Sequence, residues 1–183
     1  MLAAGKGTRL RPLTDDRPKT MIKLNNQTLL DRQLERFHRF GIKDVAVVTG
    51  YCSDAVSSQF VFKAFENKDY NSTNMAYSLF CAKEFLEDDV IISYGDILYE
   101  DQVLDKLSKS EQDISVTVDL DWEKYYSQRF QNPYDDAESL IYDNNLKITD
   151  IGKSNPLPKE VMAQYIGLIK LSKAGARTFF VDI

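Results

Sequence analysis

The stretch that decides the fold is at the amino end: Leu2-Ala3-Ala4-Gly5-Lys6-Gly7-Thr8-Arg9-Leu10-Arg11-Pro12-Leu13-Thr14, with Arg17-Pro18-Lys19 close behind it. An apolar run leads into two glycines, and a cluster of cations follows. Glycines let backbone N–H groups approach phosphate oxygens because no Cβ stands in the way. Lysine and arginine neutralise the charge that amides alone cannot. The stretch therefore predicts a binding site for a polyphosphate, and the alternative is a solvated basic loop.

The distribution of charge favours a single anion site. Residues 1–23 hold six Lys/Arg and two Asp, a net charge of +4, so the chain's total of −5 leaves −9 for the remainder. A mostly acidic protein is a poor candidate for general nucleic-acid binding. Its one basic segment is suited to a small polyanion bound at one place.

Length and cysteine usage indicate an ordinary globular protein. We expect one domain over residues 1–183, which is long enough for one hydrophobic core. Cys52 and Cys81 lack metal-site spacing and are predicted to be free thiols in a reducing cytoplasm. No apolar run reaches the length of a membrane span. We expect both ends to be incomplete, because a buried first strand would need residues before Leu2 and a last helix begins only near Ser172.

Strand-like and helix-like segments alternate along most of the chain. Such alternation predicts an α/β fold with a mostly parallel sheet covered on both faces. In such sheets ligands bind beyond the carboxyl ends of the strands, where the glycine loop and Asp96 both fall. We predict helices over 28–40, 53–65, 75–86 and 101–107, and strands over 44–49, 90–94 and 114–118.

The second half has a different pattern. Residues 122–130 predict a short aromatic helix, and Asp143-Asn144-Asn145 predicts the turn of a hairpin. A further strand is expected over 161–171. We interpret residues 120–160 as a small substrate-binding β/α insertion that closes over the substrate.

The spacing of Gly5 and Gly7 does not match either of two common phosphate-binding motifs. A Walker A loop needs a glycine, four intervening residues and then Gly-Lys-Ser/Thr, but Gly5-Lys6 is followed by Gly7. A dinucleotide fingerprint needs a small residue where Leu10 stands. Both alternatives fail on spacing.

The run Leu2–Leu10, then Pro12-Leu13-Thr14, then Arg17-Pro18-Lys19, resembles the signature of the nucleoside-triphosphate transferases. This family contains the sugar-1-phosphate nucleotidylyltransferases and their cytidylyltransferase relatives. The resemblance implies a Rossmann-like mixed sheet of the nucleotide-diphospho-sugar transferase type. It also implies that Arg9 holds the triphosphate and that Lys19 acts on the phosphates at the reacting centre. The residues implied to bind the nucleotide are Leu2, Ala3, Ala4, Gly5, Lys6, Gly7 and Thr8, together with Thr73 and Asn74.

Asp96 is the main candidate for a metal ligand. It follows an apolar strand and Gly95, where a carboxylate is well placed to hold Mg²⁺. The alternative is an ordinary strand-ending turn. The family resemblance implies a second metal-binding carboxylate near the carboxyl end, which points to Asp182. There the pattern departs from the family, because Phe180 stands where a glutamate is expected and Asp182 lies close behind Leu171.

Thr73-Asn74 precedes a predicted helix, so simple N-capping is the structural alternative to base recognition. The run Asn71 to Leu79 resembles the cytidylyltransferase branch. In that branch this stretch contacts the pyrimidine.

A second constellation lies in the insertion. Aromatic faces and carboxylates suit an ammonium-bearing acceptor, and Arg129 could grip its phosphate with two parallel hydrogen bonds. The alternative is an aromatic mini-core with an acidic rim. The predicted substrate-binding residues are Trp122, Arg129, Asp136 and Glu138, and their pattern resembles cytidylyltransferases for choline phosphate, phosphonates and phosphorylated amino alcohols.

The sequence thus predicts a Mg²⁺-dependent transfer of CMP from CTP to a small phosphate- or phosphonate-bearing acceptor, with release of pyrophosphate. The expected setting is cytoplasmic synthesis of a cell-surface polymer, lipid or phosphonate. Partners are expected to be the nucleotide and the acceptor, without nucleic acid or membrane, and a homodimer is left open. UTP in place of CTP, a sugar-1-phosphate acceptor and a catalytically inactive regulatory module are the alternatives.

Overall fold

The computed structural model describes residues 1–181, with side chains through Phe179. The chain divides into two compact units: Met1–Ser115 with Gly167–Ile183, and Val116–Ile166. It leaves the first unit within strand β6 (Ile114–Asp119) and returns within strand β9 (Gln164–Leu171). Each unit is described by itself.

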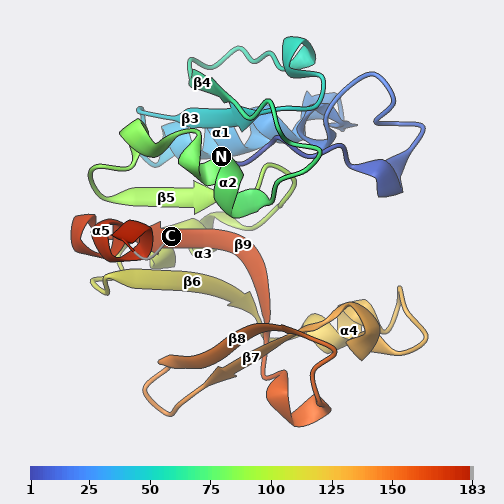
Figure 1. Cartoon of the computed structure of the whole chain (residues 1–183), viewed down its shortest axis with the longest axis vertical. Helices are drawn as coiled ribbons and strands as arrows, with labels where there is room; N and C mark the ends of the chain where they lie inside the picture. The colour runs from blue at the N-terminus through green and yellow to red at the C-terminus, as the bar shows by residue number, and fades with distance from the viewer. Residues whose placement is uncertain (182–183) are drawn as a thin grey trace. The chain divides into compact units, whose positions relative to one another are not determined.

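The first residues of the chain lie in the middle of the sheet of the first unit (Figure 1). Leu2 forms parallel bridges to Val48 of strand β3 (Ala46–Thr49) and to Tyr94, which follows strand β5 (Val90–Ser93). The N–H of Leu2 donates to the Ser93 carbonyl oxygen at 2.8 Å. Strand β3 also pairs with β4 (Lys63–Glu66), in parallel, and strand β5 also pairs with β9, in antiparallel orientation. The prediction of an α/β fold with a mostly parallel, mixed sheet is confirmed, and the pairing of β9 with β5 is an antiparallel part of it.

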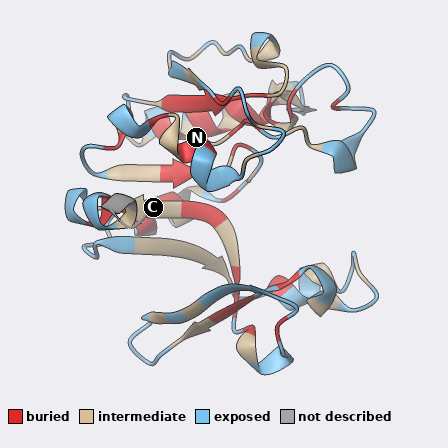
Figure 2. Cartoon of the chain, viewed as in Figure 1, coloured by how far each residue is buried: buried red, intermediate tan, exposed pale blue. Residues whose placement is uncertain are grey.

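Helix α1 (Leu29–Arg39) matches the predicted helix over 28–40. Thr28 caps it, since its Oγ1 accepts a hydrogen bond from the N–H of Asp31 at 3.0 Å. The buried face of the helix holds Leu30, Leu34 and other core residues, and β3 is buried along its whole length (Figure 2). The other helices of this unit are α2 (Met75–Phe80), α3 (Asp101–Ser108) and α5 (Lys173–Val181). A short hairpin, β1 (Lys23–Leu24) with β2 (Gln27–Thr28), precedes α1.

The helix predicted over 53–65 is wrong. The chain forms a 3-10 turn at Ser53–Ala55 and then strand β4. All four residues of β4 pair with β3, from Ala46↔Lys63 to Thr49↔Glu66. This long-range ladder outweighs the weak local helical pattern. The helix predicted over 75–86 is also interrupted, because α2 ends at Phe80 and a separate 3-10 turn spans Lys83–Phe85.

The second unit contains helix α4 (Trp122–Tyr126) and a hairpin of β7 (Glu138–Tyr142) and β8 (Ile148–Ser154). The hairpin confirms the turn predicted at Asp143-Asn144-Asn145. The Asp143 carboxylate accepts hydrogen bonds from the N–H groups of Asn145 and Lys147, at 2.8 and 2.9 Å. These bonds explain why an aspartate opens the turn.

Among the helices of residues 1–181, none has the length and apolar character needed to cross a bilayer.

Candidate nucleotide site

A cavity of about 450 Å³ in the first unit gathers residues from four distant parts of the chain. The glycine loop, the segment at Lys19, helix α2 and the turn after β5 all line it. The sequence predicted this convergence, because the loop and Asp96 both follow strands whose carboxyl ends meet at one edge. The predicted site residues that line the cavity are Leu2, Ala3, Ala4, Gly5, Gly7, Thr8, Arg9, Lys19 and Asp96.

The shape of the glycine loop depends on Gly7. Its φ of 62° lies in the left-handed region that favours glycine, and a Cβ there would lie 3.0 Å from Cβ of Lys19. The hydroxyl of the fully buried Thr14 donates to the Gly7 carbonyl oxygen at 3.0 Å. The loop is therefore folded back on itself, with Lys19 packed directly against it.

The turn that carries Asp96 is tied to the same loop. The N–H of Gly95 donates to the Leu2 carbonyl oxygen at 2.8 Å. A Cβ at Gly95 would lie 2.9 Å from that oxygen, so only glycine allows this approach. The close contact places the next residue, Asp96, at the rim of the cavity.

Lys19 and Asp96 form an ion pair in the cavity. Lys19 Nζ lies 2.5 Å from Asp96 Oδ2, and the two side chains are 37% and 35% exposed. A partly exposed pair contributes little to stability. A phosphate could replace the carboxylate beside Lys19, and a cation could replace the ammonium beside Asp96. The pair is thus suited to receive a metal-bound polyphosphate.

The carboxylate chemistry fits Mg²⁺. No group of three or more His, Cys, Asp or Glu able to hold a metal occurs within the described part of the chain. Mg²⁺ is commonly held by one or two carboxylates together with substrate phosphates. Asp96 is a candidate for one such ligand. The second predicted ligand, Asp182, lies outside the described residues.

Thr73 and Asn74 have structural roles. The Asn74 side chain caps α2 by accepting from the N–H of Tyr77 at 3.0 Å. The Thr73 hydroxyl donates to the Asp69 carbonyl oxygen at 2.8 Å. Within the described residues, α2 lines the cavity through Met75 and Ser78 rather than through this pair. Base recognition by Thr73 and Asn74 stays a prediction.

Sequence reasoning missed Asn67, which is 1% exposed. Its Nδ2 donates to the hydroxyls of Thr73 and Ser78, at 3.0 and 2.9 Å. Its Oδ1 accepts from the N–H of Asp69 at 2.9 Å. Asn67 therefore fixes the loop that leads into α2. An asparagine directly after strand β4 was the available signal, but β4 had been predicted as part of a helix.

Lys6 belongs to the glycine loop but does not line the cavity. Its Nζ is 5.9 Å from the centre of the Tyr70 ring, within range of a cation–π contact. Its predicted role in binding the nucleotide stays a prediction.

The predicted acceptor residues lie in the second unit. Trp122 is 3% exposed and packs edge-on against Tyr126 and Tyr134, with ring centres 5.4 Å apart in both pairs. This is the aromatic mini-core that the sequence left open as an alternative, so the Trp122 ring is a packing group here. Arg129, Asp136 and Glu138 remain exposed.

The three exposed residues surround one tyrosine. Burial raises the pKa of Tyr126, Asp136 and Glu138 raise it further, and Arg129 opposes them. The guanidinium carbon of Arg129 also lies 5.4 Å from the centre of the Tyr125 ring. One cation and two carboxylates therefore act on the same aromatic group of the second unit.

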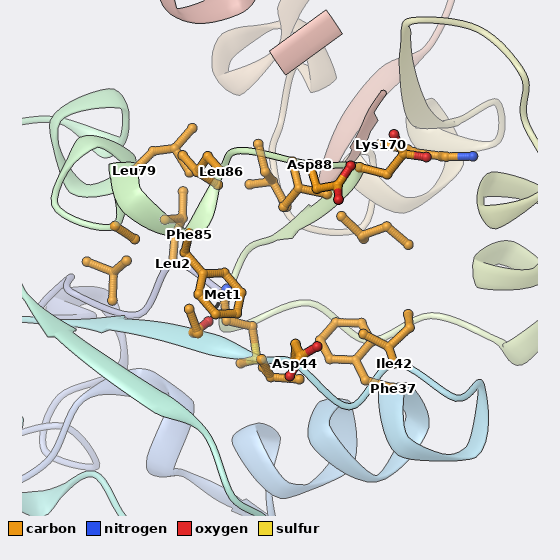
Figure 3. Close-up of a pocket in the computed structure, with 18 of the residues that line it drawn as sticks. Met1, Leu2, Phe37, Ile42, Asp44, Leu79, Phe85, Leu86, Asp88 and Lys170 are labelled. Atoms are coloured by element: carbon orange, nitrogen blue, oxygen red, sulfur yellow. Dashed lines mark hydrogen bonds between the residues drawn. The ribbon is translucent and has the colours of Figure 1, made fainter. Parts of the chain in front are cut away.

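A larger cavity of about 840 Å³ lies elsewhere in the first unit. Figure 3 shows Leu79, Phe85 and Leu86 lining it from one side and Phe37 and Ile42 from the other. Its charged lining residues are mostly carboxylates, and Lys170 donates to the carbonyl oxygens of Ser108 and Ser110. It lacks the glycine loop and is unsuited to a polyanion.

Comparisons with known proteins agree with this geometry. The family model described as Nucleotidyl transferase matches residues 1–128. A CTP:phosphoglutamine cytidylyltransferase of Campylobacter jejuni is 40% identical over 182 residues, covering 94% of this chain and 72% of that protein. A choline-phosphate cytidylyltransferase of Streptococcus pneumoniae is 27% identical over 154 residues, covering 82% of this chain and 61% of that protein.

The fold is shared with solved structures. The inositol-1-phosphate CTP transferase from T. maritima aligns with a TM-score of 0.75 at 23% identity, covering 100% of this chain and 72% of that one. At that identity the likeness concerns the fold.

Proposed function

The chain belongs to the nucleotidyl transferase family, and from this premise we propose that it transfers CMP from CTP to a small phosphate-bearing acceptor and releases pyrophosphate. The cavity that holds the glycine loop, Arg9, Lys19 and Asp96 together is the observation that carries the proposal. The 40% identity to a phosphoglutamine cytidylyltransferase favours CTP and a phosphorylated amino-acid derivative or amino alcohol.

The proposed reaction is an in-line displacement at phosphorus. A phosphate oxygen of the acceptor attacks the α-phosphorus of CTP and forms a new P–O bond. The bond from the α-phosphorus to the oxygen shared with the β-phosphate breaks, and pyrophosphate leaves with that electron pair. The attacking oxygen is already an anion at neutral pH, so no general base is needed.

The difficulty is electrostatic, because two polyanions must meet. Backbone N–H groups of the glycine loop are placed to receive the phosphates, and Arg9 and Lys19 offset the charge that builds on the leaving group. Asp96 would hold Mg²⁺ together with the phosphate oxygens, and the ion when bound supplies positive charge there. Replacing the carboxylate beside Lys19 by a phosphate frees both partners of the pair for these roles.

Acceptor recognition is assigned to the second unit. Arg129 would bind the acceptor phosphate, while Asp136 and Glu138 would attract its ammonium group. The charges of all three side chains influence the pKa of Tyr126, and this shared influence supports the proposal. Phosphonates carry the same anionic group on carbon and belong to the same class of candidate acceptor.

Pyrophosphate release tests the proposal. The purified chain is incubated with CTP or UTP and Mg²⁺, and with phosphoglutamine, choline phosphate, aminoethylphosphonate or glucose 1-phosphate in turn. Turnover with CTP and an amine-bearing phosphate or phosphonate is expected. Preference for a sugar phosphate or for UTP would indicate the nucleotidylyltransferase alternative, and no turnover with any pair would contradict the proposal.

A further inference from the structure

Gln33 is a fully buried polar residue on the core face of α1, at 0% exposure. Its Nε2 donates to the carbonyl oxygens of Tyr94 and Ile97, at 2.9 and 3.1 Å. Its Oε1 accepts from the hydroxyl of Ser93 at 2.6 Å. Both amide hydrogens and the amide oxygen are therefore used, which accounts for a glutamine in the core.

The two carbonyl groups bonded to Gln33 flank the residues that matter for the site. Tyr94 precedes Gly95-Asp96 and Ile97 follows them, so one carboxamide spans the whole turn. On the opposite side, the N–H of Gly95 donates to the Leu2 carbonyl oxygen. Hydrogen bonds to Leu2 and to Gln33 of α1 therefore hold the turn in place.

We propose that Gln33 is a positioning residue that fixes the Gly95-Asp96 turn, so that the Asp96 carboxylate faces Lys19 and the nucleotide cavity. The inference rests on the proposed function. Without the carboxamide, the half-buried carbonyl groups of Tyr94 and Ile97 each lose a hydrogen bond, although the Ser93 hydroxyl still donates to Tyr94 at 3.2 Å. The loss carries a desolvation cost that a shift of the turn would relieve. A shift of the turn moves the carboxylate away from Lys19 and from any cation held there.

The test compares Gln33→Leu with a matched variant of the same helix. Leucine keeps the approximate volume and removes all three hydrogen bonds. Thr28→Ala removes the cap of α1 and lowers stability, but leaves the bonds from Gln33 to the turn intact. Ser93→Ala is the milder second variant if Gln33→Leu does not fold, because it leaves both bonds from Gln33 to the turn and removes the hydroxyl that donates to Gln33 Oε1 and, at 3.2 Å, to the Tyr94 carbonyl oxygen.

The first measurement needs no activity. Hydrogen exchange at the Gly95 amide is expected to accelerate at least tenfold in Gln33→Leu relative to Thr28→Ala, measured at equal loss of thermal stability. The NMR signal of the Lys19 ammonium group is expected to shift when Asp96 is replaced by Asn in the native chain, because the ion pair is lost. In Gln33→Leu the same replacement is expected to leave that signal unchanged. Equal exchange in the two variants, with a Lys19 signal that still shifts on that replacement in Gln33→Leu, would overturn the inference.

The second measurement follows the metal and the reaction. Mn²⁺ serves as the probe for the carboxylate site, and its affinity in the presence of CTP is expected to fall by about 10- to 100-fold in Gln33→Leu. The kcat is expected to fall similarly while KM for CTP changes little. A rise in KM alone, or Mn²⁺ binding equal to that of Thr28→Ala, would also overturn the inference. A native chain that neither turns over nor binds Mn²⁺ would instead contradict the proposed function, and the exchange measurement would still decide the role of Gln33.

Discussion

Lys19 Nζ and Asp96 Oδ2 lie 2.5 Å apart although 77 positions separate the two residues in the chain. Each is the counter-ion of the other until a ligand enters. The close packing at Gly7 holds Lys19 in place, and Gly95 holds Asp96. Contacts within the chain itself therefore hold both side chains in place, and such preorganisation reduces the ordering that binding of a ligand must bring about.

Lys19→Ala is expected to reduce kcat/KM by on the order of a hundredfold or more, because it removes a cation that stabilises charge on the leaving phosphates. Thermal stability should change little, since the side chain is 37% exposed. Steady-state assays of pyrophosphate release and a melting curve measure the two effects. Lys23→Ala, at an exposed position outside the cavity, is the control. Near-normal turnover of Lys19→Ala would refute the role of its ammonium group.

Asp96→Asn is expected to abolish the activation of turnover by Mg²⁺, because a neutral amide is a weak ligand for a hard cation. A Mg²⁺ titration of the initial rate measures this. Asp88→Asn is the control, because it removes the same single negative charge at a side chain that is 83% exposed. Its Mg²⁺ titration should match that of the native chain. A normal Mg²⁺ dependence in Asp96→Asn would place the metal elsewhere.

Gly7→Ala and Gly41→Ala form a matched pair. Both glycines have a positive φ, 62° and 76°, so alanine costs about 1 kcal/mol of backbone strain at either position. Only at Gly7 would the new Cβ meet a neighbour, Cβ of Lys19 at 3.0 Å, whereas Gly41 has open space around it. Denaturant unfolding should show a loss in both variants, while nucleotide affinity should fall only in Gly7→Ala. Equal affinity in the two variants would exclude steric coupling between the loop and Lys19.

Asp101 is expected to make stability depend on pH. Hydrogen bonds from Arg36 and then Arg39 lower the pKa of Asp101 below its usual value. Its carboxylate therefore stabilises the fold above the ordinary pKa of aspartate, and this contribution is lost as pH falls through the lowered pKa. Asp101→Asn should melt at a lower temperature than the native chain at neutral pH, and the gap should close in acid. A gap that persists unchanged at low pH would contradict the assignment.

The parts of the site that the sequence predicted are those set by local geometry. The glycine loop and Asp96 follow short apolar strands, and the rule that parallel strands end at one edge brings them together. Strand β4 could not be predicted in this way, because Lys63–Glu66 becomes a strand only by pairing with β3. Gln33 was hidden for a similar reason. Its position on the apolar face of a predicted helix was visible, but its partners lie at least 60 positions away, at 60 for Ser93, 61 for Tyr94 and 64 for Ile97.

The insertion of Leu2 between β3 and the end of β5 has a consequence for how the protein matures. The segment that carries the glycine loop is synthesised before both of its neighbours, and the second of them, at Tyr94, comes far later in the chain. Contacts between residues so distant in the chain form late. The entropy cost of closing the long intervening loop comes before the contacts contribute any stabilising free energy. The glycine loop and the turn that carries Asp96 are therefore expected to come together only when this part of the sheet is completed.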